Sequence, residues 1–224
     1  MNQLKSKTPL LNNPSQCLGV NIEIINENPP MAKIENLLSS WECQHIIDKA
    51  RPNLSSSTMI VNNKEVVDPK GRSSRSAYLT TSGKLPENDI VIHRFLTRLS
   101  KLIDIPISHF EGMKVVNYQT NQEYKGHYDY FQNHDNFTKN TGDRMYTFFV
   151  YLNTLDAEKN GGSTSFPKLN LKIAPVAGTG IFWVNLLNHP ERKYFDQTLH
   201  AGEMVTGEVE KWGINVWIRE KPYK

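Results

Sequence analysis

Short β-rich runs separated by turn residues fill the second half of the chain, and this feature constrains the fold most. The runs are Met113–Tyr118, His127–Phe131, Tyr146–Leu152, Leu171–Pro175, Gly180–Asn185, Gln197–His200 and Lys211–Arg219. Pairs such as Gly161-Gly162 and Ala201-Gly202 predict turns or bulges between them. Many short strands without intervening helices are typical of a sandwich or a barrel, of which the jelly roll is one type. The pattern therefore predicts a C-terminal double-sheet β core.

The first half of the chain carries two helical patterns. Ser39 and Glu42 have the spacing of a capping box, and a second helix is predicted to open near Pro86. The apolar faces of the two helices are Cys43, Ile46, Ile47 and Ala50 in the first, and Phe95, Leu96, Leu99 and Ile103 in the second. Ala32–Leu38 is predicted as a short strand, Asp68–Gly83 as a loop, and the Asn- and Pro-rich residues 1–30 as a flexible segment. We expect one domain over residues 31–224, with a helical flank over about 31–105 and the β core over about 106–224.

Composition excludes several classes of function. The 224 residues carry a net charge of only +3, and basic and acidic residues are interspersed, so we expect neither nucleic-acid nor membrane partners. Two cysteines, Cys17 and Cys43, are too few for a disulfide framework and are predicted to be free thiols. The N-terminus shows no apolar signal region, so a cytoplasmic location is expected.

His127, Asp129 and His200 form a candidate metal site. Residues two apart in a strand point to the same face, so His127 and Asp129 can aim at one point. His200, at the end of another β run, would complete a triad of two imidazoles and one carboxylate. Such a facial triad leaves three positions open on octahedral Fe(II), enough for a bidentate 2-oxo acid and O₂. His-x-Asp alone is a weak signal, and a zinc site from the same ligand types stays open at this point.

A longer ordered set of motifs surrounds these residues. It comprises Asn117-Tyr118, Tyr124 to Phe131, Arg144 and Thr147, Phe148 to Asn153, Gly161 to Pro167, His200-Ala201-Gly202 and Lys211-Trp212. In this order the chain resembles the prolyl 4-hydroxylase family of Fe(II)- and 2-oxoglutarate-dependent dioxygenases, especially its small bacterial cytosolic members. The resemblance runs from about Ala32 to Lys224 and is densest from Glu111 onward.

The resemblance implies a double-stranded β-helix, or jelly-roll, core and a role for each matching residue. His127, Asp129 and His200 would bind Fe(II), and Lys211 would pair with the far carboxylate of 2-oxoglutarate. Tyr118 and Thr147 match further contacts to that co-substrate, through hydroxyls that can hydrogen-bond carboxylate oxygens. The positions that match the family's peptide groove are Tyr124, Arg144, Trp217 and Glu111.

The segment between His200 and Lys211 departs from the family pattern. Met204 stands where a proline is usual, and one extra residue precedes the lysine. An inserted residue within a strand would exchange the faces of everything after it. Trp212, Ile214, Val216 and Ile218 alternate as an apolar face, which leaves Lys211 and Trp217 together on the other. We therefore choose Lys211 over Glu210 and place the insertion in a bulge or longer turn near Gly207.

The activity that the resemblance implies is hydroxylation of peptidyl proline at C4, coupled to decarboxylation of 2-oxoglutarate to succinate and CO₂. It would require Fe(II), 2-oxoglutarate and O₂, with ascorbate as reductant, a proline-containing peptide or protein as partner, and a homodimer as the expected assembly. Three alternatives stay open: a dioxygenase of the same fold acting on a free amino acid or other small molecule, a non-catalytic jelly-roll binding module, and a zinc hydrolase.

Overall fold

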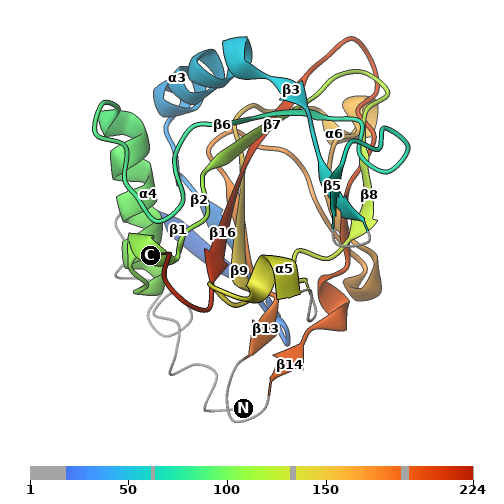
Figure 1. The fold of residues 1–224 in the computed structure, drawn as a ribbon. Coiled ribbons are helices and arrows are strands. Elements are labelled where there is room, and N and C mark those ends of the chain that lie inside the picture. The colour runs from blue at the N-terminus through green and yellow to red at the C-terminus, as the bar shows by residue number, and fades with distance from the viewer. Residues whose placement is uncertain (1–18, 62–63, 132–134, 188–191, 224) are drawn as a thin grey trace.

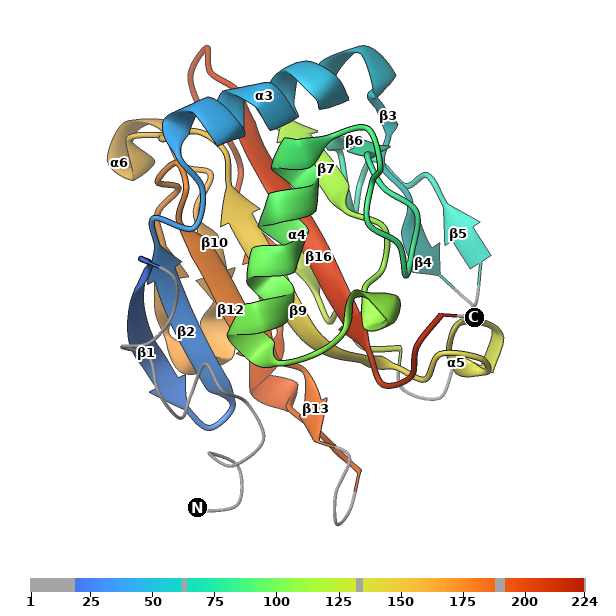
Figure 2. The same ribbon diagram turned by 90° about the vertical axis from the view of Figure 1, so that its left-hand side faces the viewer.

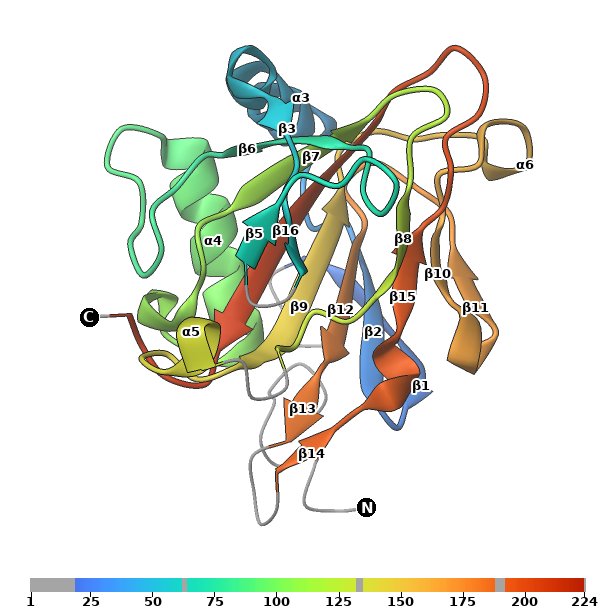
Figure 3. The same ribbon diagram turned by 45° about the vertical axis from the view of Figure 1, so that its right-hand side comes forward.

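Two antiparallel sheets face each other in the computed structural model, which describes residues 19–61, 64–131, 135–187 and 192–223 (Figures 1 and 3). The larger sheet has eight strands in the order β1-β2-β12-β9-β16-β7-β6-β3, and the smaller has four in the order β11-β10-β15-β8. The larger sheet contains β1 (Asn21–Glu27), β2 (Pro30–Glu35), β12 (Gly180–Val184), β9 (Arg144–Tyr151), β16 (Lys211–Arg219), β7 (Lys114–Tyr118), β6 (Arg75–Tyr78) and β3 (Ser55–Ser56). The smaller contains β11 (Leu171–Ile173), β10 (Thr164–Phe166), β15 (His200–Gly202) and β8 (Tyr124–His127).

Two small hairpins and several short helical turns complete the described elements. The hairpins are β4 (Met59–Val61) with β5 (Lys64–Val66), and β13 (Leu186–Leu187) with β14 (Lys193–Tyr194). The short turns are α5 (Asp135–Thr138), α6 (Ala157–Asn160), η2 (Arg51–Asn53), η3 (Ile107–His109), η4 (Pro167–Leu169) and η5 (Asp196–Thr198).

The two longer helices, α3 (Ser40–Ala50) and α4 (Ile90–Ile103), cover the outer face of the larger sheet (Figure 2). The predicted capping box at Ser39 and Glu42 begins α3. Helix α4 begins later than predicted, because the Asp89 carboxylate accepts the N–H groups of Val91 and Ile92 and so caps the helix there. No helix among the described residues is long and apolar enough to cross a bilayer.

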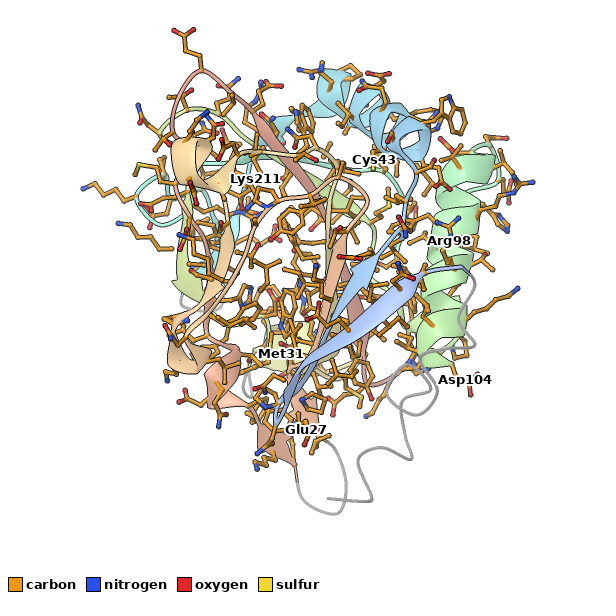
Figure 4. All side chains as sticks on the ribbon, turned by 180° about the vertical axis from the view of Figure 1, so that it is seen from behind. Glu27, Met31, Cys43, Arg98, Asp104 and Lys211 are labelled. Carbon is orange, nitrogen blue, oxygen red and sulfur yellow. The ribbon has the colours of Figure 1, made fainter. Side chains whose placement is uncertain are left out.

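Apolar residues fill both faces of the larger sheet. The alternation predicted for β16 is confirmed: Trp212, Ile214, Val216 and Ile218 belong to the core beneath the helices. A second core lies between the sheets and includes Phe149, Phe166 and Trp183. Met31 and Lys211 both lie inside the molecule, in contrast to the surface residues around them (Figure 4). The cysteine Cys43 is buried and free, whereas Cys17 lies outside the described residues.

The predicted flexible segment over residues 1–30 differs from the structure in its described part. Residues Asn21–Glu27 form β1, which pairs with β2 in register Ile22↔Ile34. The β-branched run around Ile22 and Ile24 supports a strand, and pairing with β2 outweighs the Asn- and Pro-rich composition nearby. The division into one domain over 31–224 stays a prediction.

Three further segments depart from the expected secondary structure. The predicted loop Asp68–Gly83 contains β6, which pairs with β7 and gains its order from that ladder. The predicted strand His127–Phe131 ends at His127. The predicted strand Gln197–His200 begins within the 3₁₀ turn η5, and only His200 belongs to a strand, β15. Both differences have one cause: the β8–β15 ladder stops at the pair His127↔His200, so residues beyond it have no strand partner.

Candidate metal centre and substrate cavity

His127, Asp129 and His200 converge on one point between the sheets. His127 and His200 are opposite each other in the β8–β15 ladder. Asp129 lies two residues beyond the end of β8, and its oxygens are 3.9 Å from His127 Nε2 and 3.7 Å from His200 Nε2. One ligand atom from each residue lies within 4.8 Å of the others. The predicted triad is thus assembled, although Asp129 reaches it from a loop rather than from the strand.

Hydrogen bonds to the backbone orient both imidazoles. His127 Nδ1 lies 2.9 Å from the carbonyl of Lys125, and His200 Nδ1 lies 2.8 Å from that of Thr198. With Nδ1 donating, each ring turns the Nε2 lone pair toward Asp129. Burial, and then the neighbouring His200, hold the pKa of His127 well below its usual range. A neutral imidazole is the form that binds a metal ion.

A chain of side chains holds the Asp129 carboxylate in place. Thr147 Oγ1 donates to Asp129 Oδ2 at 2.8 Å, and Asn185 Nδ2 donates to Thr147 Oγ1 at 2.9 Å. Thr147 is fully buried in β9, next to β12. The structure therefore gives Thr147 a role behind a metal ligand, and its predicted contact with 2-oxoglutarate stays a prediction.

The triad opens on a cavity of about 340 Å³ between the sheets. Of the residues predicted for the site, those lining it are Tyr118, Tyr124, His127, Asp129, Arg144, His200, Lys211 and Trp217. Glu111 and Thr147 do not line it; each lies behind a lining residue and bonds to it. The structure thus brings the predicted ligands and most of the predicted co-substrate and groove residues to one cavity.

Lys211 is a buried cation in the wall of this cavity. Only 1% of its surface is exposed, and its Nζ lies 5.3 Å from the ring centroids of both Tyr118 and Phe149. No carboxylate among the described residues forms an ion pair with it, and burial lowers the pKa of Lys211 to about 7. A buried ammonium without a partner is costly, so the site is suited to an anionic ligand that supplies one.

Residues 203–210, where the extra residue before Lys211 was predicted to lie, form a loop between β15 and β16. Val205 forms an isolated bridge with Gly161, and Val205 O accepts the N–H of Asn121 at 2.7 Å. Gly207 then turns the chain with φ +76°, a conformation that favours glycine. Lys211 consequently enters β16 opposite Tyr118 and on the same face as Trp217.

Comparison with known proteins places this geometry in a family. Residues 113–219 match the family model described as the 2OG-Fe(II) oxygenase superfamily. The chain is 31% identical over 225 residues to probable prolyl 4-hydroxylase 10 of Arabidopsis thaliana, covering 91% of this chain and 73% of that protein. The chain belongs to the prolyl 4-hydroxylase family. It is accordingly a 2-oxoglutarate-dependent dioxygenase, as the sequence motifs predicted.

Other relatives of the prolyl 4-hydroxylase family agree with this membership. The human prolyl 4-hydroxylase subunit alpha-1 is 31% identical over 87% of this chain, which spans 35% of that subunit. The solved 2-oxoglutarate complex of a viral collagen prolyl hydroxylase from Paramecium bursaria Chlorella virus-1 is 30% identical. It superimposes with a TM-score of 0.65 and covers 84% of this chain and 95% of that one. The jelly-roll fold is thereby confirmed.

The cavity fits the metal and the co-substrate of this prolyl 4-hydroxylase family. Two imidazoles and one carboxylate are the ligand set of non-haem Fe(II) oxygenases. Lys211 offers the cation that a 2-oxo dicarboxylate requires at its far end. Trp183, which lines the cavity beside His200, has a buried indole N–H without a partner among the described residues. Such an unsatisfied donor is consistent with a polar ligand in the cavity.

A bidentate ion pair braces the predicted substrate groove. Arg144 Nε and Nη2 donate to the two Glu111 oxygens at 2.6 and 2.7 Å. Burial alone would raise the pKa of Glu111, but Arg144 and then Arg219 outweigh it and hold that pKa below its usual range. The Arg144 guanidinium also lies 3.8 Å from the centroid of the Trp217 ring. The pair therefore fixes the orientation of Trp217 at the cavity wall.

Tyr124 forms the opposite wall, close to the metal centre. Its ring stacks on His127 with centroids 3.5 Å apart, and the Arg72 guanidinium lies 4.4 Å from its centroid. Burial raises the pKa of Tyr124 to about 12, so its hydroxyl stays protonated at neutral pH. The two aromatic walls that the motifs predicted, Tyr124 and Trp217, thus both line the cavity.

Several residues of the site were not predicted from the sequence, and four of them bear on its chemistry. Arg72, Lys114 and Trp183 line the cavity, and Asn185 holds Thr147. The sequence places Lys114 on the same strand face as Tyr118, but it does not show that Lys114 is buried. Arg72 was assigned to a loop, and the role of Asn185 depends on the pairing of β12 with β9, which no local pattern contains.

Proposed function

We propose that this chain hydroxylates proline at C4 within a peptide or protein chain. The reaction consumes 2-oxoglutarate and O₂ and yields succinate and CO₂, with one oxygen atom placed on proline and the other in succinate. The observation that carries the proposal is that three metal-ligand side chains and an unpaired buried lysine open on one cavity. Membership of the prolyl 4-hydroxylase family supports the choice of proline.

Bound Fe(II) and 2-oxoglutarate supply the oxidising chemistry in this family, and the protein supplies binding and orientation. His127, Asp129 and His200 would hold the metal on one side and leave its other side toward the cavity. Lys211 would neutralise the far carboxylate of the co-substrate, with the Tyr118 ring centroid 5.3 Å from its Nζ. Because Lys211 has no competing partner among the described residues, it is free to bind this anion.

The walls of the cavity support a peptide rather than a small molecule. Tyr124 and Trp217 offer aromatic surface for a proline ring, and the buried Trp217 N–H has no partner among the described residues. Proline-rich chains adopt a preformed extended helix whose carbonyls remain free to accept hydrogen bonds. Aromatic-lined grooves bind such chains in other proteins. The solved relatives include a prolyl hydroxylase in complex with a peptide fragment from Trichoplax adhaerens, which at 16% identity supports the fold alone.

The test measures hydroxyproline by mass spectrometry after incubation with Fe(II), 2-oxoglutarate and air. Proline-containing peptides and free proline are compared as substrates, and succinate is measured in parallel. We expect peptides to gain one oxygen atom on proline and to form equal amounts of succinate. Turnover of free proline alone would support the small-molecule alternative and overturn the peptide proposal. Absence of metal binding would instead favour a non-catalytic binding module.

Three further features belong to the proposal and rest on the resemblance. We propose ascorbate as the reductant, a cytoplasmic location and a homodimeric assembly. Ascorbate is expected to prolong turnover in a time course, and light scattering is expected to give the mass of two chains. A mass of one chain at all protein concentrations would contradict the homodimer.

A further inference from the structure

A second buried lysine, Lys114, lines the same cavity. It lies in β7, where Lys114 and Tyr118 share one face, and its cross-strand neighbours are Tyr78 in β6 and Asn215 in β16. Only 4% of its surface is exposed, and its side chain contributes to the cavity wall. Lysine is rarely buried in proteins unless it is paired.

No described residue pairs with the Lys114 ammonium. Its Nζ lies 5.0 Å from the centroid of the Tyr78 ring, and neither an ion pair nor a hydrogen bond to a described residue satisfies it. Burial, together with the nearby Arg72 and Arg144, lowers the pKa of Lys114 to about 7. Glu65 and Glu111 raise the pKa of Lys114, but too little to return it to its ordinary value. The folded chain therefore keeps a destabilised cation at the wall of its substrate cavity.

The same arrangement exists at Lys211, where the co-substrate explains it. Lys211 is opposite Tyr118, whereas Lys114 is opposite Asn215, four positions further along β16. Four residues of strand separate the backbone of Lys211 from that of Asn215 by roughly 13 Å, a span longer than one small dicarboxylate held at Lys211 and the metal. A second anion would satisfy the Lys114 ammonium, and the remaining ligand of this cavity is the substrate.

The charge of the cavity wall points to the same conclusion. Its lining includes four cations, which are Arg72, Lys114, Arg144 and Lys211, and two carboxylates, which are Glu65 and Asp129. Fe(II) and 2-oxoglutarate carry opposite and equal charge, so loading the site does not reduce this excess. Arg144 is neutralised by Glu111 from behind the wall. Lys114 and Arg72 are left as cations without ion pairs among the described residues.

We propose that Lys114 binds a carboxylate of the substrate chain, so that the preferred substrate carries an Asp or Glu side chain near the target proline. This inference rests on the proposed function and narrows it to acidic proline-containing segments. Lys114 is a specificity-determining residue in this proposal and takes no part in the oxidation. A carboxylate at a chain end has the same chemistry, and the test below separates the two sources.

The test compares three capped peptides that differ at one position beside proline, occupied by Glu, Gln or Lys. A fourth peptide has the neutral sequence and a free terminal carboxylate. We expect kcat/KM for the Glu peptide to exceed that for the Gln peptide by about tenfold, the size of one charge-assisted hydrogen bond. In Lys114→Met this ratio is expected to fall toward one. Lys101→Met removes a charge from an exposed position on α4 and is expected to leave the ratio as in the wild type.

The outcomes separate this inference from the proposed function. Equal turnover of the Glu and Gln peptides by the wild-type protein overturns the role of Lys114 and leaves proline hydroxylation intact. Preference for the free terminal carboxylate alone overturns the choice of an acidic side chain. Absence of hydroxyproline from every peptide overturns the proposed function itself. Because the first comparison uses only the wild-type protein, the result does not depend on whether Lys114→Met folds.

Discussion

At the residue scale, Lys211 destabilises the ligand-free fold and at the same time provides the cation that 2-oxoglutarate requires. Its ammonium is surrounded by aromatic rings instead of carboxylates, and burial brings its pKa down to about 7. One pKa unit corresponds to about 1.4 kcal/mol of preference between the protonation states. The ligand-free fold therefore disfavours the charged lysine that 2-oxoglutarate requires. Binding of the 2-oxoglutarate dianion favours the charged form of Lys211. The affinity for 2-oxoglutarate therefore depends on the protonation of Lys211.

Substitution of Lys211 by methionine is expected to separate stability from co-substrate binding. The KM for 2-oxoglutarate should rise ~30-fold or more, because removing one partner of a buried charge pair costs about 2–5 kcal/mol. The ligand-free protein should be stabilised at pH 7 by ~1 kcal/mol or more, because a destabilised cation is removed. Denaturant unfolding and steady-state kinetics measure the two effects. An unchanged KM would mean that another residue holds the far carboxylate.

As the pH rises above 7, the stability of the ligand-free wild-type protein and its affinity for 2-oxoglutarate should change in opposite directions. The folded pKa of Lys211, about 7, is below the ordinary value of 10.5, so the unfolded chain binds more protons between these values. Stability of the ligand-free fold should therefore rise with pH in this window, and Lys114 contributes in the same direction. The affinity for 2-oxoglutarate should fall by up to about tenfold per unit above pH 7. Affinity that increases with pH would contradict the assignment.

At the scale of elements, two strands of the larger sheet position Asp129, the metal ligand that lies beyond the strands of the smaller sheet. The β8–β15 ladder places the two histidines but ends before Asp129. Thr147 in the middle of β9 reaches across to this carboxylate, and Asn185 at the end of β12 orients Thr147. Metal-ligating carboxylates need such outer partners to keep a productive orientation. The loop ligand is thus fixed by two strands.

Replacement of Thr147 by valine should weaken metal binding while preserving the fold. Loss of the hydroxyl that donates to Asp129 is expected to lower metal affinity 10- to 100-fold, the usual effect of removing an outer-shell partner. Titration with Fe(II) under anaerobic conditions measures it. Thr97→Val in α4 is a matched control, because the Thr97 hydroxyl is buried without a partner among the described residues. Equal metal affinity in the two variants would show that Thr147 does not hold the ligand.

At the scale of the whole molecule, the sequence predicted what local spacing and motif order contain. The metal triad followed from the His-x-Asp spacing and the order of the motifs. The choice of Lys211 over Glu210 and the shared face of Lys211 and Trp217 followed from alternation along β16. Features that arise from pairing between distant strands escaped prediction. The end of β8 depends on β15, the order of β6 depends on β7, and the hydrogen bond from Asn185 depends on β12 meeting β9. Lys114 was missed because burial, which makes a lysine unusual, is a property of the folded chain.

Hydroxyproline and succinate formed by the wild-type protein, His127→Ala and Asp129→Ala decide whether these side chains hold the metal. We expect one hydroxyproline per succinate in the wild type. We expect neither product from the two variants, although both keep a cooperative unfolding transition. Products formed equally by the variants would show that these side chains do not hold the metal, and the oxygenase site would have to lie elsewhere.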